Sequence, residues 1–132
     1  NNKLYFLQTK EYDNENDNSN VIYSELNVYK FMFMGDASVT TEKEIMNKYN
    51  LPDIDVLKVG HHGSKTSSSK GFINVINPKY SIISVGKNNR YGHPNKEVLE
   101  NLSKSKIYRT DQDGSIMFKI KNNKLKIGTC LP

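Results

Sequence analysis

The side chains best suited to chemistry in this sequence lie in short loops, and the most informative loop is "GHHGS" (60–64). It places His61 and His62 between glycines, directly after an apolar stretch. A neutral imidazole is the commonest metal ligand in proteins, and flanking glycines let a loop orient it without strain. Adjacent side chains point in different directions, so we expect one of the pair to bind a given metal while its neighbour packs or supports it. The alternative is a pair of solvent-exposed loop histidines.

Two other loops carry candidate groups. "GDAS" (35–38) places Asp36 directly after an apolar run, and "GKNNRYGHP" (86–94) contains His93. Asp36 is either a metal ligand or an ordinary turn or helix-capping aspartate. His93 is either a ligand, a general acid or a phosphate contact, or a histidine that caps a helix. Polar side chains of the same loop could contact an anionic substrate: Lys87, Asn88, Asn89 and Arg90.

The elements that must position these loops alternate between strands and helices. Apolar β-prone runs predict strands, and apolar residues at helical spacing predict helices. The expected strands are 3–8, 21–26, 29–34, 53–59, 80–85, 106–110, 115–120 and 124–128, and the expected helices are 40–49, 70–76 and 95–104. Thr41 with Glu44 predicts a capping box in the first helix, and Pro94 suits the first turn of the third.

This order of elements predicts an α/β fold with a mixed β-sheet, about three helices and a C-terminal β-hairpin. Parallel strands are expected in the middle of the sheet. Ligands gather at the carboxyl ends of such strands, so the three loops are expected to share one edge of the sheet.

Composition narrows the classes of protein. A chain of 132 residues suits one domain, no apolar run approaches the length of a membrane span, and the single cysteine, Cys130, excludes a disulfide framework. Residues 1–57 hold five lysines and ten acidic residues, whereas residues 58–132 hold fourteen lysines and arginines and four acidic residues. The basic half fits a nucleic-acid partner, and equally a solvated lysine-rich surface. Only this charge asymmetry favours a pure DNA-binding domain, because the sequence shows no helix-turn-helix motif and no aromatic stacking platform.

Longer motifs bear a specific resemblance. "DIDVLKVGHHGSKTSSS" (53–69) and "SVGKNNRYGHP" (84–94) resemble the C-terminal half of a metallo-β-lactamase-fold hydrolase, in particular the domain of ComEC-like bacterial DNA-internalisation competence proteins. The resemblance extends from about Asn16 to Ile116. It implies that residues 1–132 form a single partial domain, one half of an αββα sandwich whose metal ions sit at one edge between two sheets.

The resemblance also implies roles for individual residues. Asp36 would bridge two divalent ions, zinc or manganese, and His62 would bind one of them, with His61 as the alternative. His93 and Arg90 would contact the substrate or the transition state. The implied reaction is hydrolysis of a phosphodiester, with DNA as the expected partner and no membrane contact by this segment. The remaining candidates for substrate binding are Ser64, Lys87 and Asn88.

One part of the family pattern is missing. The motif His-x-(His/Asp)-x-Asp-His, which supplies the first ligands in the family, does not occur, and "EYDNENDNSN" (11–20) has acidic residues but no histidine. The sequence therefore predicts half of a metal site. Either a separate first half completes it, with pairing to that half or to a second copy, or the chain is a truncated, metal-free interaction module. Relatives in this family occur both free and fused to membrane segments, which leaves the compartment open.

Overall fold

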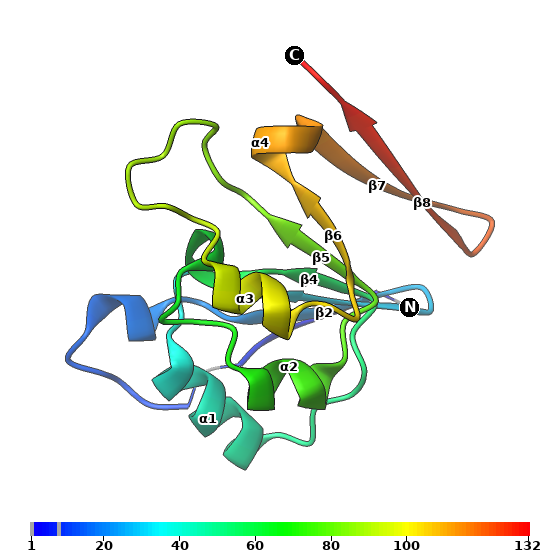
Figure 1. The fold of residues 1–132 in the computed structure, drawn as a ribbon. Coiled ribbons are helices and arrows are strands. Elements are labelled where there is room, and N and C mark those ends of the chain that lie inside the picture. The colour runs from blue at the N-terminus through cyan, green and yellow to red at the C-terminus, as the bar shows by residue number, and fades with distance from the viewer. Residues whose placement is uncertain (1, 8) are drawn as a thin grey trace.

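A mixed β-sheet runs through the middle of the molecule and decides where the candidate loops lie (Figure 1). In the computed structural model, which describes residues 2–7 and 9–132, this sheet has six strands in the order β1-β2-β3-β4-β5-β6. The first three strands pair antiparallel, whereas β3 to β6 pair parallel, so the predicted parallel middle is confirmed. The strands are β1 (Lys3–Phe6), β2 (Ile22–Leu26), β3 (Tyr29–Phe33), β4 (Val56–Lys58), β5 (Tyr80–Ile83) and β6 (Lys106–Arg109).

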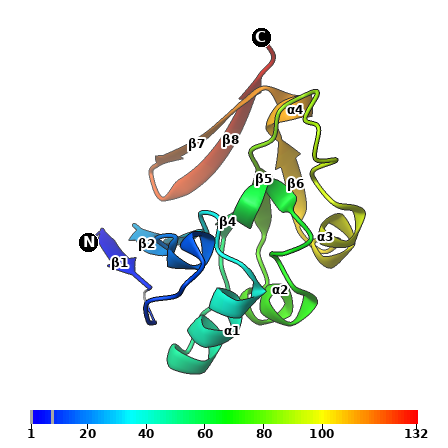
Figure 2. The ribbon, with the colours of Figure 1, turned by 90° about the vertical axis from the view of Figure 1, so that its left-hand side faces the viewer.

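Helices cover one face of the sheet (Figure 2). Because side chains alternate along a strand, Met32, Leu57 and Ile83 all point to this face, where they are fully buried. Apolar side chains from each helix complete this core, among them Ile45, Phe72 and Val98. The helices are α1 (Val39–Lys48), α2 (Lys70–Ile76) and α3 (Lys96–Asn101).

A C-terminal hairpin crosses the opposite face of the sheet, as Figure 2 shows. It consists of β7 (Ser115–Lys121) and β8 (Lys124–Cys130), and the single-turn helix α4 (Thr110–Asp113) leads into it from β6. Phe118 of β7 packs edge-on against Phe31 of β3, with ring centroids 6.3 Å apart. The hydroxyl of Tyr29 accepts from the amide of Leu125 and donates to the carbonyl of Asn123, both at 2.9 Å. These contacts fix the turn of the hairpin to the start of β3.

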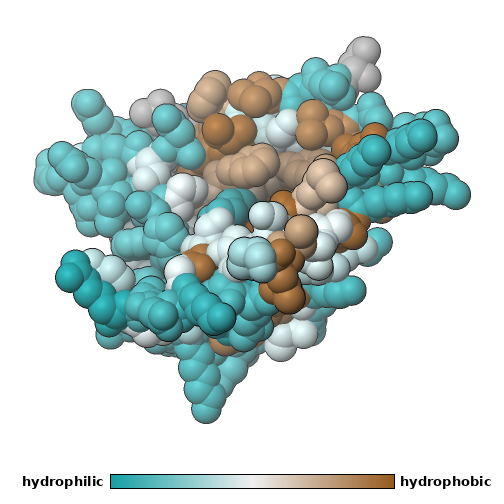
Figure 3. Space-filling view, turned by 90° about the horizontal axis from the view of Figure 1, so that it is seen from above, coloured by the Kyte–Doolittle hydropathy of each residue, from teal (hydrophilic) through white to brown (hydrophobic). Residues whose placement is uncertain are grey.

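The hairpin leaves part of this face open. Leu4 and Phe6 of β1 and Phe33 of β3 remain 59%, 60% and 42% exposed, and β2 lies between these two strands. Figure 3 shows a continuous hydrophobic patch over this side of the molecule. Contiguous exposed apolar surface of this kind is often covered by another polypeptide or a ligand in the assembled protein. In the part of the chain that the structure describes, no helix is both long and apolar enough to cross a membrane.

Two features predicted for the starts of helices were wrong. Helix α1 begins at Val39 and its N-cap is Ser38, whose side chain accepts from the amide of Thr40, so the capping box of Thr41 with Glu44 does not form. Thr41 is instead buried and donates to Asp17. Helix α3 begins at Lys96 with Asn95 as N-cap, which places Pro94 before the helix.

The remaining elements occur where the sequence predicted them, with ends that differ by up to three residues. Gln8, at the end of the first predicted strand, lies outside the described residues. Three short helical turns were not predicted: Glu15–Asn18, Gly60–Gly63 and α4. Each is a single turn of polar or glycine-rich sequence, which has no apolar periodicity to reveal it.

Candidate functional site

The loops that follow β3, β4 and β5 meet at one edge of the sheet because these strands are parallel neighbours. The amide of His61 donates to the carbonyl of Gly35 at 2.9 Å, which joins the second loop to the first. The amide of Asn95 donates to the carbonyl of Gly63 at 2.8 Å, which joins the third loop to the second. The structure therefore brings the three predicted loops together.

The histidine doublet has an unusual backbone. His61 and His62 adopt left-handed conformations with φ of 45° and 57°. Residues with a Cβ rarely occupy this region, and each such residue costs on the order of 1–3 kcal/mol unless its surroundings hold it. Gly63 follows with φ of 79°, and a Cβ there would lie only 2.6 Å from the Cβ of Pro94. The doublet is thus held in a strained turn, a feature that often accompanies functional sites.

The ring of His62 is oriented by the segment that directly follows β5. Its Nδ1 lies 2.7 Å from the carbonyl oxygen of Ser84. Because a carbonyl only accepts, this contact places the ring proton on Nδ1 and leaves the lone pair on Nε2. Metal-binding histidines are commonly held in this way. His61 has a weaker partner, since its Nδ1 lies 3.4 Å from the hydroxyl of Thr66.

His61 connects the other two imidazoles. Its ring centroid lies 6.3 Å from that of His62 and 6.2 Å from that of His93. A pocket of about 200 Å³ opens beside this cluster, and its lining includes His62, Val85, Asn89, Tyr91 and His93. Partial burial, together with the positive charge that His61 and His62 can carry, lowers the pKa of His93. His93 is therefore neutral at pH 7, a form that can either donate or accept a hydrogen bond.

Asp36 lies at the same edge. Its backbone amide donates to the hydroxyl of Ser19 at 3.2 Å, which fixes the start of the turn. Among the described residues, no group forms a hydrogen bond or ion pair with its carboxylate. Burial lowers the pKa of Lys58 at the end of β4, while the negative charge of Asp36 opposes that shift. Lys58 was not among the residues predicted from the sequence, although a lysine inside the apolar run "DVLKV" was a signal.

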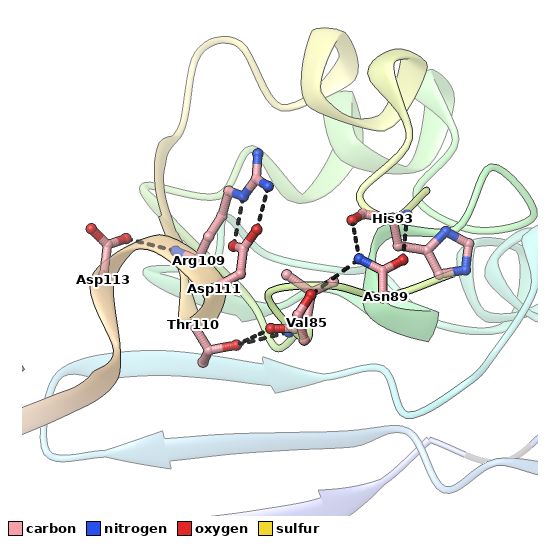
Figure 4. Close-up of polar contacts among 8 residues, drawn as sticks. Val85, Asn89, His93, Arg109, Thr110, Asp111 and Asp113 are labelled. Atoms are coloured by element: carbon pink, nitrogen blue, oxygen red, sulfur yellow. Dashed lines mark hydrogen bonds and ion pairs between the residues drawn. The ribbon is translucent and has the colours of Figure 1, made fainter. Parts of the chain in front are cut away.

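Asn89 shapes the third loop (Figure 4). Its side-chain oxygen accepts from the amide of His93 at 2.9 Å, and its side-chain nitrogen donates to the carbonyl of His93 at 2.8 Å. The same nitrogen lies 3.2 Å from the carbonyl of Gly86. The side-chain amide of Asn89 therefore makes these hydrogen bonds within its own loop. At the base of the loop, the hydroxyl of Thr110 bridges the amide and the carbonyl of Val85, at 2.8 and 2.9 Å.

The predicted substrate-binding residues occupy different environments. A guanidinium nitrogen of Arg90 lies 3.0 Å from the hydroxyl of Tyr91, whose ring stacks on His93 at a centroid distance of 5.7 Å. Arg90 is thereby held close to the imidazole cluster. Lys87 and Asn88 are exposed at the tip of the loop. Ser64 is buried and contacts Thr66, with 3.0 Å between the two hydroxyls, so its side chain shapes the loop.

Buried carboxylates brace the first two loops from the helix side. Glu42 of α1 is 1% exposed and accepts from the amides of Ser68 and Ser69 and from the Ser69 hydroxyl. Burial raises the pKa of Glu42, although these three donors oppose the shift. Asp17 accepts in a similar way from Ser38 and Thr41 at the start of α1. Neither residue was predicted from the sequence, because buried carboxylates cannot be told from exposed ones by pattern alone.

A further ion pair stiffens the segment after β6. The guanidinium of Arg109 binds the carboxylate of Asp111 through two nitrogens, at 3.0 and 2.6 Å, and the Arg109 amide donates to Asp113 at 2.8 Å (Figure 4). The two-point contact lowers the pKa of Asp111. This segment carries Thr110, so the pair helps to hold the base of the His93 loop.

The chain supplies some metal donors but not a full set. In residues 2–7 and 9–132, no three histidine, cysteine, aspartate or glutamate side chains are grouped so as to hold a metal ion. A larger pocket of about 520 Å³ lies elsewhere, between β1, β2 and the residues after α1. It is lined by aromatic and apolar side chains with one carboxylate, Glu25, and has no histidine. We therefore place the candidate site at the histidine loops.

The fold and this edge define an α/β domain with a cluster of histidines at the carboxyl ends of parallel strands. No protein-family model matches the chain. It is 43% identical over 117 residues to ComE operon protein 3 of Bacillus subtilis (strain 168), a match that covers 87% of this chain. It is 36% identical over 119 residues to competence protein ComA of Neisseria gonorrhoeae, and 34% over 115 residues to recombination protein 2 of Haemophilus influenzae, each covering 86% of this chain.

These relatives are much longer proteins. The matched segments make up 15%, 17% and 14% of the respective relatives, so this chain corresponds to one small part of each. The similarity links the chain to bacterial competence proteins, in agreement with the resemblance seen in its motifs.

Proposed function

We propose that this chain forms part of a metal-dependent phosphodiesterase of the metallo-β-lactamase superfamily that acts on DNA, as in ComEC-like competence proteins. The observation that carries the proposal is the meeting of the Asp36 loop, the His61–His62 doublet and His93 at one edge of the sheet. The similarity to competence proteins supports DNA as the substrate. Because one fold hosts many activities, the proposal depends on these residues more than on the fold.

The donors fit part of a two-metal site. An aspartate carboxylate and the free Nε2 of an oriented imidazole suit zinc or manganese, and Asp36 and His62 are the residues we assign to this role. Divalent ions bound there would supply Lewis-acid activation and charge neutralisation for phosphodiester hydrolysis. The missing ligands would come from a polypeptide segment that carries the His-x-(His/Asp)-x-Asp-His motif.

For contact with the substrate, this chain has one permanently positive side chain, Arg90, close to the three histidines. Arg90 is held against Tyr91 and can neutralise a phosphate oxygen. His93 is neutral at pH 7, so we assign it a hydrogen bond to the phosphate rather than a charge. Lys58, at the end of β4, is a further basic side chain beside these loops, although burial lowers its pKa.

The open part of the sheet suggests where the missing segment would lie. Leu4, Phe6 and Phe33 expose apolar surface on the face opposite the helices. A second sheet placed on this face would bury that surface and bring its ligands to the same edge. A second copy of the chain is the other candidate for this position.

A second candidate function is a metal-free interaction module. The observation in its favour is that the described residues do not group three metal donors. Measurements of metal binding and of catalysis distinguish the phosphodiesterase from the metal-free module, whereas a measurement of folding does not.

A chimera provides the test. The segment of B. subtilis ComE operon protein 3 that matches this chain would be replaced by the chain, and cleavage of duplex DNA would be assayed with manganese. We expect cleavage that Asp36→Asn and His62→Ala reduce by at least about 10–100-fold, the range that is typical when even the support of a metal ligand is lost. The matched control is Asp53→Asn, an exposed aspartate before β4 that binds Asn77.

The control variant should cleave DNA like the parent chimera. A parent chimera that is folded and binds manganese but leaves DNA intact would contradict the nuclease proposal. Equal activity in Asp36→Asn and in Asp53→Asn would contradict the assignment of Asp36. If His61→Ala abolishes cleavage and His62→Ala does not, the alternative ligand is the correct one.

A further inference from the structure

The outer face of the β7–β8 hairpin concentrates positive charge. The register pairs Lys119 directly with Lys126, and Lys121 with Lys124. These four lysines are exposed, and they share one face because side chains alternate along a strand. The opposite face packs on the sheet through Phe118, Ile120 and Leu125, among others. We call the set Lys119, Lys121, Lys124 and Lys126 the lysine face.

The positive charge of the lysine face is not neutralised by acidic side chains of the hairpin. Like charges placed directly opposite one another destabilise an antiparallel pair. Residues 115–132 contain no aspartate or glutamate. Among the described residues, ion pairs within 4.0 Å involve Lys10, Lys96 and Arg109, and none involves the lysine face. A polyanion on this surface would relieve the repulsion.

The hairpin presents these charges on a rigid support. Tyr29 anchors its turn through two hydrogen bonds of 2.9 Å, and Phe118 packs on Phe31. Along one strand, side chains two residues apart are separated by about 6.6–6.8 Å. The strands therefore space the lysines regularly, and each of these long side chains can contact a different phosphate of the DNA backbone.

The chemistry of this face favours DNA over a membrane. Proteins that lie on lipid insert apolar side chains next to their cationic ones. Here the apolar side chains of the hairpin turn toward the sheet, and the exception on the lysine-bearing side is Met117. In Figure 3, hydrophilic side chains project at the end of the molecule where the turn of the hairpin lies.

We propose that the lysine face binds the phosphate backbone of duplex DNA without sequence preference. The choice of DNA as the polyanion rests on the proposed function, but the binding itself does not require hydrolysis. The hairpin begins beside α4, next to the base of the His93 loop, and its turn lies at Tyr29. It would therefore hold a duplex along a line that leads away from the histidine edge.

The test measures binding of the chain to a fluorescent 30-base-pair duplex in EDTA, from 50 to 200 mM salt. The variant Lys119→Gln/Lys126→Gln removes two charges from the lysine face. The control Lys43→Gln/Lys104→Gln removes two exposed charges on the helix side of the molecule. We expect the slope of log K against log salt to become less negative by about 1.8 in the first variant, from about 0.9 per lost phosphate contact, and to stay unchanged in the control.

A second variant distinguishes a loss of DNA binding from a loss of folding. Lys119→Glu creates an attractive pair with Lys126, so it should raise the unfolding midpoint and still weaken DNA binding. Equal effects of the two double variants would overturn the proposal, because they would show a response to net charge alone. Binding to vesicles of phosphatidylserine but not to the duplex would also overturn it. Loss of hydrolysis in the Asp36→Asn chimera with unchanged DNA binding would leave this proposal intact while locating the failure in the metal site.

Discussion

At the scale of single residues, the site depends on side chains that hold the backbone of others. Asn89 is the clearest case, because its amide contacts both the amide and the carbonyl of His93. The sequence suggests that Asn89 could bind substrate, but the structure assigns it a positioning role. His62 is oriented in a comparable way by the carbonyl of Ser84.

We predict that Asn89→Ala frees the His93 loop. Loss of three hydrogen bonds at a half-buried site should lower the free energy of unfolding by about 1–2 kcal/mol. The pKa of His93 should rise toward its ordinary value, because the ring loses its partial burial and its closeness to His61 and His62. An NMR titration of the imidazole protons measures this shift. Asn88→Ala, one residue earlier and exposed, should leave both quantities unchanged, and an unaltered His93 in Asn89→Ala would argue against the positioning role.

At the scale of elements, helix α1 acts as a brace for the histidine doublet. Its buried Glu42 holds the amides of Ser68 and Ser69, and the amide of Val39 donates to the carbonyl of Thr66 at 2.9 Å. Both contacts reach the loop that continues from His61 and His62. The strained backbone of the doublet is therefore supported by a helix that precedes it in the sequence.

We predict that Glu42→Ala destabilises the protein by about 2–4 kcal/mol, because it leaves buried donors without partners. Glu44→Ala is the matched control: Glu44 pairs with Lys10 at 3.6 Å on the surface, and its loss should cost less than about 0.5 kcal/mol. Urea unfolding gives both values, and hydrogen exchange should show faster exchange at Ser68 and Ser69 in the first variant. Similar stability of the two variants would mean that Glu42 does not brace the loop.

At the scale of the whole molecule, a sheet with helices on one face and a hairpin on the other places the candidate residues at one edge and leaves an apolar patch beside them. The apolar runs predicted the strands and their parallel pairing because buried strands read directly as hydrophobic segments. The meeting of the loops followed from that topology. The supports of the site could not be predicted, because contacts such as Asp17 with Ser38, or Thr110 with Val85, join residues more than 20 positions apart.

The assignment of metal ligands stays a prediction from the sequence and its resemblance. The structure adds the free Nε2 of His62 and the hydrogen bond from the His61 amide to Gly35, the residue that precedes Asp36 in the chain. Among the described residues, no three metal donors are grouped. Our proposal assigns two ligands to this chain, and we expect two ligands to bind metal weakly, which variants of Asp36 and His62 can test.

The most direct test of the central claim is a zinc titration of the chain followed by ¹⁵N NMR of the imidazole rings. We predict weak binding that shifts Nε2 of His62, disappears in Asp36→Asn and persists in Asp53→Asn. A His62 ring that fails to respond to millimolar zinc, or that responds equally in the chain and in Asp36→Asn, would contradict a cation shared by Asp36 and His62.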